Sequence, residues 1–181
     1  TGTSNKAYLN IIHDIWDGLP YLSGHGIGIS LSSSCTTNEI YRNYIYNCYL
    51  GIVTTITGGS GGDKIYHNLV KDSYINGIDI IGDPGIDPIY VYNNTVIHNP
   101  NPAVNDGDPV GHGISIQSNA KKAVWANNIV ETKRHSTVTN NVQAYYIADG
   151  SGGLISLKTN NNLVYQSDSE AHIGKIINSS G

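Results

Sequence analysis

The feature that most constrains this chain is a short block of sequence that recurs six times. In each block an asparagine lies two residues before an apolar, usually β-branched residue. The blocks are Ala7–Ile12, Ile40–Ile45, Ile65–Val70, Val91–Val96, Val124–Ile129 and Thr159–Val164, and their asparagines are Asn10, Asn43, Asn68, Asn94, Asn127 and Asn162. These asparagines are 33, 25, 26, 33 and 35 residues apart. All six prolines lie outside the blocks, as hydrogen-bonded strands require.

A second pattern, Gly-Ile-x-Ile or a close variant, follows most of the blocks. It occurs at Gly26–Ile29, Gly51–Val53, Gly77–Ile80 and Gly113–Ile116. Together the two patterns predict a solenoid, in which each coil has two or three short strands and buries its apolar face by stacking on the next coil, about 4.8 Å away. Asparagine at one place in every coil predicts a ladder of side-chain hydrogen bonds, with the asparagine in the left-handed conformation at a corner. A β-sandwich with irregular hairpins does not explain a fixed register repeated six times.

Composition agrees with an all-β fold and excludes two function classes. The 181 residues suffice for one domain over 1–181, and the chain is poor in strong helix formers. Charged residues make up 13% and the net charge is −4, so no surplus of lysine and arginine exists to bind nucleic acid. Membrane insertion is not expected either, because no apolar stretch approaches roughly 18 residues.

Two further features concern processing and redox state. The chain contains no methionine and its start does not resemble a signal peptide, so we expect a mature portion or a fragment of a longer chain. Cys35 and Cys48 permit either one disulfide or two buried thiols.

The repeat resembles that of the right-handed parallel β-helix proteins of the pectin-lyase-like superfamily, from about Ala7 to Val164. This resemblance implies a single-stranded right-handed parallel β-helix of about six coils, a polysaccharide as partner, and an extracellular or cell-surface location. The superfamily includes pectate lyases, polygalacturonases, uronan epimerases, phage tailspikes and plain surface proteins. The fold therefore leaves open whether the chain is an enzyme.

Strand alternation and connector length predict a cleft over the strand that contains Asp79. Ile78 and Ile80 face the core, so Asp79 points outward. Its column in the other coils contains Gly28, Val53 and Ser115. The long connectors 13–25 and 98–112 flank two tight coils and would form walls around a floor about 10 Å wide, which suits an extended sugar chain.

The two predicted walls carry candidate functional residues. Trp16, Tyr21 and His25 lie in the first wall, where the aromatic rings can stack on sugars. Asp106 and Asp108 lie in the second, where either can pair with Asp79 as two carboxylates for glycoside hydrolysis. In the alternative interpretation the loop aspartates are ordinary turn residues and the aromatic residues serve packing.

The segment Gly111-His112-Gly113 is similar to the Gly-His-Gly segment of polygalacturonases, and Asn76–Ile80 is similar to their Asn-Thr-Asp segment. The resemblance implies that Asp79 belongs to the acidic catalytic group and that His112 supports it. The chain departs from this family because the Asp-Asp pair and the Arg-Ile-Lys segment are missing. Gly24-His25-Gly26 repeats the pattern in the first coil, which favours a repeated corner as the alternative interpretation.

A lyase would need a base and a group that neutralises the uronate carboxyl. Lys133 and Arg134, in a basic stretch of the fifth coil, are candidate substrate-binding residues. Asp83 and Asp87 can bind Ca²⁺ through oxygen ligands, although Asp-Pro-Gly is also a turn sequence.

Two functions therefore remain open. The first is a lyase or hydrolase that acts on an acidic glycan in the cleft over Asp79, with Ca²⁺ as a candidate cofactor. The second is a non-catalytic surface, adhesin or tailspike-type module that binds glycan or serves as a spacer. Residues 1–6 contain no amphipathic helix that would cover the first coil, so we expect another domain or subunit to cover the N-terminal end.

Overall fold

The structure, a computed structural model, describes residues 4–15, 26–32, 37–55, 61–82, 87–98, 111–117, 122–132, 143–148, 156–166 and 172–177. All regular secondary structure in these ranges is β-strand, as the sequence predicted. None of these residues belongs to a helix that could cross a membrane.

The strands form three six-stranded sheets in which all neighbouring strands are parallel. The first sheet contains β1 (Lys6–Tyr8), β4 (Glu39–Tyr41), β7 (Lys64–Tyr66), β10 (Ile89–Tyr92), β13 (Lys122–Ala126) and β16 (Ser156–Asn160). The second contains β2 (Ile11–His13), β5 (Tyr44–Tyr46), β8 (Leu69–Lys71), β11 (Thr95–His98), β14 (Ile129–Thr132) and β17 (Leu163–Gln166). The third contains β3 (Ile27–Ser32), β6 (Leu50–Thr55), β9 (Asn76–Ile81), β12 (His112–Gln117), β15 (Gln143–Ala148) and β18 (His172–Ile177).

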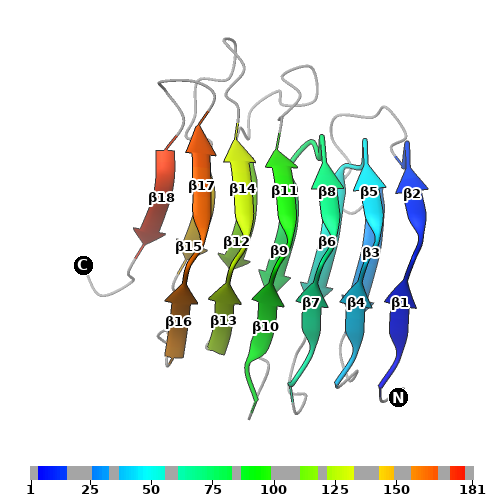
Figure 1. Ribbon diagram of the computed structural model, residues 1–181, viewed down its shortest axis with the longest axis horizontal. Helices are drawn as coiled ribbons and strands as arrows, with labels where there is room; N and C mark the ends of the chain where they lie inside the picture. Colours follow the sequence, from blue (N-terminus) through cyan, green and yellow to red (C-terminus); the bar gives the residue numbers. More distant parts are fainter. Residues whose placement is uncertain are drawn as a thin grey trace.

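Three successive strands, one in each sheet, make up one repeat, and every sheet keeps the repeats in chain order (Figure 1). This arrangement of stacked parallel sheets is compatible with a parallel β-helix. The inward side chains of all three sheets form one apolar cluster. In the second repeat Ile40, Ile45 and Ile52, one from each sheet, are fully buried. Each repeat therefore buries its apolar residues against its neighbours.

A ladder of asparagines connects the repeats between the first and second sheets, and its four internal members are buried. Its members are Asn10, Asn43, Asn68, Asn94, Asn128 and Asn162. The backbone N–H and Nδ2 of Asn43 both donate to Oδ1 of Asn68, at 3.1 and 2.9 Å, and the other steps repeat this pair of bonds. Nδ2 also donates to a backbone carbonyl in the preceding repeat, as from Asn68 to Ile40 at 2.9 Å. The predicted ladder is thus confirmed.

Two details of the predicted alignment are wrong. In the fifth repeat the ladder residue is Asn128 instead of Asn127, and Trp125 takes the core position beside Val91. The left-handed corner residue is the one before each ladder asparagine, which is Asn127 in this repeat, with φ 55°. Because Asn127 and Asn128 are adjacent, the repeated pattern agrees equally well with either of them as the ladder residue.

The first repeat is also shifted by two residues from the prediction in the third sheet. Gly28 lies in the glycine column with Gly51, and Ser30, not Gly28, occupies the column of Asp79. Glycine is needed at position 28 because a Cβ there would lie 2.7 Å from the carbonyl oxygen of Gly51. The sequence Gly-Ile-Gly-Ile offered two equivalent alignments, and only this close approach separates them.

The thiol of Cys48 is free and buried. Of the two alternatives for the cysteines, the thiol form therefore holds for Cys48, whereas Cys35 lies outside the described residues.

We predict that Asn68→Ala lowers the free energy of unfolding by about 3 kcal/mol, because it orphans buried donors on Asn43 and the carbonyl of Ile40. Equilibrium urea unfolding measures the change. Asn10→Ala is the matched control: this asparagine is exposed, water can replace its bonds, and the loss should stay below about 1 kcal/mol. Equal losses in the two variants would contradict a dominant role of the buried ladder.

Candidate functional site

Only part of the predicted site falls within the described residues. Asp79, His112 and Asp87 are described. The other predicted residues lie outside the described ranges, namely Trp16, Tyr21, His25, Asp83, Asp106, Asp108, Lys133 and Arg134. Both predicted walls of the cleft are therefore largely outside these ranges as well.

Asp79 lies in β9 between Val53 of β6 and Ser115 of β12, as the register predicted. Its neighbours Ile78 and Ile80 belong to the apolar cluster, so alternation places Asp79 on the opposite face of the strand. The residue is nevertheless buried, because only 3% of it is exposed. Alternation tells which side of a strand a residue faces, and it does not tell whether that side is covered.

Side-chain amides hold the Asp79 carboxylate. Asn76 Nδ2 donates to Oδ2 at 3.0 Å, and Gln117 Nε2 donates to Oδ1 and Oδ2 at 3.0 and 3.1 Å. Oδ1 of Asn76 in turn accepts the backbone N–H of His112 at 3.1 Å. The structure thus links Asp79 to His112 through Asn76, and the link uses the backbone of His112. Neither Asn76 nor Gln117 was a predicted site residue, because neither residue type ionises.

Burial raises the pKa of Asp79 to about 6, although hydrogen bonds from Asn76, Ser115 and Gln117 lower it. A carboxyl group that titrates near neutral pH can give up or take a proton under physiological conditions. This is the property of a general acid or base, and it is also the property of a buried structural acid.

Two histidines are buried close to this network. His98 in β11 and His112 in β12 are both almost completely buried. Burial and the electrostatic effect of the nearby His112 ring lower the pKa of His98 to about 3, so His98 is neutral at physiological pH. A Cβ at Gly111 would overlap Nε2 of His98. The first glycine of Gly-His-Gly therefore has a packing role in this chain.

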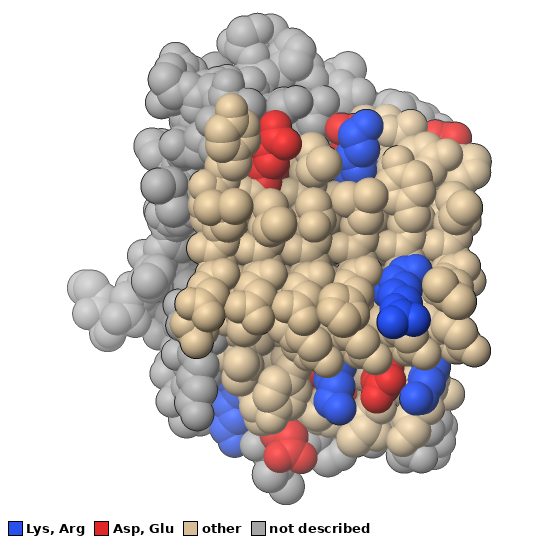
Figure 2. Space-filling view, in the orientation of Figure 1, with Lys and Arg blue, Asp and Glu red and all other residues tan. Residues whose placement is uncertain are grey.

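The outer face of the first sheet carries a row of stacked tyrosines. Tyr8, Tyr41, Tyr66 and Tyr92 follow one another with ring centroids 5.0 Å apart and interplanar angles of 4 to 6°. Four of the recurring blocks contain tyrosine at the same place, and this signal was present in the sequence. Figure 2 shows this face together with that of the second sheet, and the charged side chains lie mostly along the upper and lower edges of the view.

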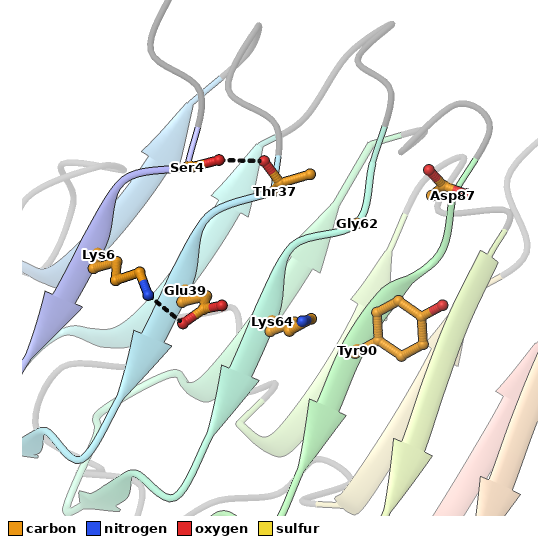
Figure 3. Close-up of a pocket in the computed structure, with 8 residues that line it drawn as sticks. All are labelled: Ser4, Lys6, Thr37, Glu39, Gly62, Lys64, Asp87 and Tyr90. Carbon is orange, nitrogen blue, oxygen red and sulfur yellow. Dashed lines mark hydrogen bonds and ion pairs between the residues drawn. The ribbon is translucent and has the colours of Figure 1, made fainter.

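A groove of about 500 Å³ lies beside the tyrosine row, on the same side of the same strands. Figure 3 shows the residues that line it. It is lined by Ser4, Lys6, Thr37, Glu39, Gly62, Lys64, Asp87 and Tyr90. Positions 6, 39, 64 and 90 form one column of the sheet, two residues before the tyrosines. This column contains lysine, glutamate, lysine and tyrosine in successive repeats, so no repeated pattern in the sequence indicated it.

The charges in the groove are partly paired. Glu39 Oε2 lies 3.3 Å from Lys6 Nζ and accepts the hydroxyl of Tyr66 at 3.1 Å. Burial opposes ionisation of Glu39, but these two bonds prevail and hold its pKa below the ordinary value. Burial and Glu39 together raise the pKa of Tyr66 to about 12, so its hydroxyl keeps its proton.

The groove also contains Asp87, one of the two predicted Ca²⁺ ligands. Among the described residues no three acidic, histidine or cysteine side chains come together in a way that could hold a metal ion. The second predicted ligand, Asp83, lies outside this part of the chain.

Comparison with protein-family models, with curated proteins and with solved structures found no match to this chain.

We predict that Asp79→Asn removes a pH dependence of stability. The pKa of Asp79 is raised from 3.8 to about 6, so the stability gained from its protonated form is present below pH 4 and is lost as the pH rises through 6. One pKa unit corresponds to about 1.36 kcal/mol. Between pH 4 and pH 7.5 the free energy of unfolding of the variant should therefore rise by about 3 kcal/mol relative to that of the wild type. Urea unfolding across this range measures the difference.

The comparison must be made as a difference between the two proteins. His98 has the opposite effect, since its lowered pKa makes the fold less stable as the pH falls below its unfolded value. This contribution is present in both proteins and cancels in the difference. If the difference in free energy of unfolding between the two proteins stays constant with pH, Asp79 is already ionised at pH 5 and the prediction is wrong.

Proposed function

We propose that the chain is a right-handed parallel β-helix of six coils, similar to the pectin-lyase-like superfamily, and that it binds a polysaccharide at the cell surface or outside the cell without cleaving it. The binding surface is the outer face of the first sheet. The observation that carries the proposal is that the groove and the tyrosine row lie side by side on the same four strands.

The chemistry of this face suits a sugar polymer. Sugar hydroxyls both donate and accept hydrogen bonds, and the groove offers donors such as Lys64 and acceptors such as Asp87. The stacked tyrosines add apolar ring edges along the same surface. Their 5.0 Å spacing is close to the length of one sugar unit in an extended chain, so a polymer crossing the strands meets similar groups at successive units.

Burial of the ionisable groups favours binding over cleavage. A catalytic acid or base must reach the atoms that react. Asp79, His98 and His112 are each at most 3% exposed. The exposed charges of the groove, in contrast, are directly available to a ligand.

We predict that the chain is retarded in native gels that contain a polysaccharide, and that Lys64→Ala weakens this binding about tenfold, as expected for the loss of one charge-assisted hydrogen bond. The test compares polygalacturonate and alginate with neutral glucans. Lys71→Ala is the matched control, because Lys71 is a partly exposed lysine of the same repeat that lies on the second sheet and pairs with Asp72 at 3.1 Å. No retardation by any polysaccharide, or equal weakening by both substitutions, would reject the proposed surface.

A second candidate function is cleavage with Asp79 as the general acid. The raised pKa of Asp79 favours it, because a proton donor works best when its pKa lies near the operating pH. The predicted substrate is an acidic glycan, reached through the cleft over β9.

If this second function holds, the wild type releases unsaturated products or new reducing ends from an acidic polysaccharide, with or without Ca²⁺. Asp79→Asn should then lower the rate by at least about a hundredfold, as for loss of an acid catalyst, while retardation in the gel stays unchanged. Absence of product on every polysaccharide that the chain binds would leave binding alone.

A further inference from the structure

Exposed apolar side chains gather on the outer face of the second sheet. Of the eight exposed large apolar side chains in the described ranges, five lie on this face, namely Ile11, Leu69, Ile129, Leu163 and Tyr165. The residues that alternate with them, such as Val70 and Val130, belong to the apolar cluster, so these five point away from the core. Apolar side chains that adjoin one another on a surface mark an interaction site.

The face consists of two columns of outward side chains. The first column contains no charged residue, and its members are Ile11, Tyr44, Leu69, Thr95, Ile129 and Leu163. The second column contains His13, Tyr46, Lys71, Ile97, Glu131 and Tyr165. In Figure 2 the area over these strands, in the upper half of the view, is accordingly mostly tan. The one lysine and the one glutamate of the second column are separated by the repeat of Ile97, which lies midway between them.

We propose that a second copy of the chain packs face to face on this sheet, about a two-fold axis that runs parallel to the strands at the repeat of Ile97. The fourth repeat then faces the fourth repeat of the partner, the third faces the fifth, and the second faces the sixth. Because the two halves of the contact are equivalent, the interface closes on itself and the assembly ends at a dimer. The inference does not depend on the proposed function.

In this register the apolar side chains of the face cover one another. The facing pairs in the two copies are Leu69 with Ile129, Tyr44 with Leu163, Tyr46 with Tyr165, and Ile97 with Ile97. In the single chain Leu163 and Ile129 are 60% and 45% exposed, so their removal from water stabilises the dimer.

The two charged side chains of the face are complementary in the same register. Lys71 lies opposite Glu131 of the partner subunit, and the two-fold axis makes this ion pair occur twice. Lys71 Nζ already lies 3.1 Å from Asp72, but the lysine side chain is still 44% exposed and can approach a second carboxylate. The face thus carries its own counter-charges at matching positions, which favours a second copy as its partner.

Other two-fold arrangements of the same face lack this match. An axis at the repeat of Lys71 or of Glu131 brings two like charges together. A shift of half a repeat from the proposed axis places one of these charges opposite Ile97. An axis along the stack places Lys71 opposite Leu69 and Glu131 opposite Ile129. Each of these arrangements covers a charge without a partner of opposite sign, which is costly.

The contact is small, so the dimer is reversible. The five overlapping strands span about 19 Å along the stack, at about 4.8 Å per strand. Interfaces below about 1,200 Å² belong to weak, transient associations, and we expect a Kd of roughly 10 µM or above. The native gels of the polysaccharide test, at nanomolar protein, therefore contain the single chain, and Lys71→Ala remains a valid control there.

Sedimentation equilibrium without polysaccharide tests the proposal. We expect the mass of the wild type to rise with protein concentration from one chain to two and to stop there. Lys71→Glu and Glu131→Lys should each weaken the dimer at least tenfold, because each places like charges opposite one another. The double variant Lys71→Glu with Glu131→Lys should restore the wild-type Kd within about threefold. Lys122→Glu is the matched control, since it reverses a partly exposed lysine in the repeat of Glu131 but on the first sheet, and it should associate as the wild type does.

Mixing the two single variants separates the two-fold contact from other forms of association. Lys71→Glu has two glutamates on the face and Glu131→Lys has two lysines, so each chain opposes a copy of itself and complements the other. Their one-to-one mixture should form a heterodimer with the wild-type Kd. A wild type that stays monomeric up to about a hundred times the expected Kd, growth beyond two chains, single reversals that leave the dimer unchanged, or a mixture that stays monomeric would each overturn the proposal. Circular dichroism of each variant confirms that the strands are retained.

Discussion

The buried side-chain amide of the ladder asparagine is the group on which the rest of the structure depends. An amide removed from water must have partners for two donors and one acceptor, and an orphaned group costs roughly 1–3 kcal/mol. Each ladder asparagine meets this demand only when the next repeat places an asparagine at the same point. The ladder residues are 33, 25, 26, 34 and 34 residues apart, so connectors can vary widely while the register stays fixed.

The fixed register also creates the environment of Asp79. It aligns Asp79 with Val53 and Ser115, and it brings Gln117 of the next strand within 3.0 Å of the carboxylate. These neighbours solvate the acid with amides while excluding water. The carboxyl group consequently titrates near pH 6, although its column in the two adjacent repeats contains no other acid. The register that stabilises the fold thus also places the Asp79 carboxyl in a buried environment that the adjacent repeats do not share.

The sequence allowed the strands, the ladder and the core columns to be predicted because each is imposed on every repeat. It did not decide between Asn127 and Asn128, or between Gly26 and Gly28, because local patterns agreed equally with both alignments. The burial of Asp79 was missed for another reason: period-two alternation contains no information about what covers the outer side of a sheet. The groove was missed because its charged residues come from four repeats, and no single residue type recurs in all four.

The outer face of the first sheet divides the stack into two parts. The tyrosine row continues from Tyr8 to Tyr92, and the same column then contains Ala126 and Asn160. Neither the core nor the ladder requires tyrosine at these outward-facing positions, and each stacked pair adds only about 0.5–1.5 kcal/mol. The groove ends at the same repeat, with Asp87 and Tyr90. Because both features stop together, the first four repeats form one continuous surface, and the last two repeats extend the fold without extending that surface.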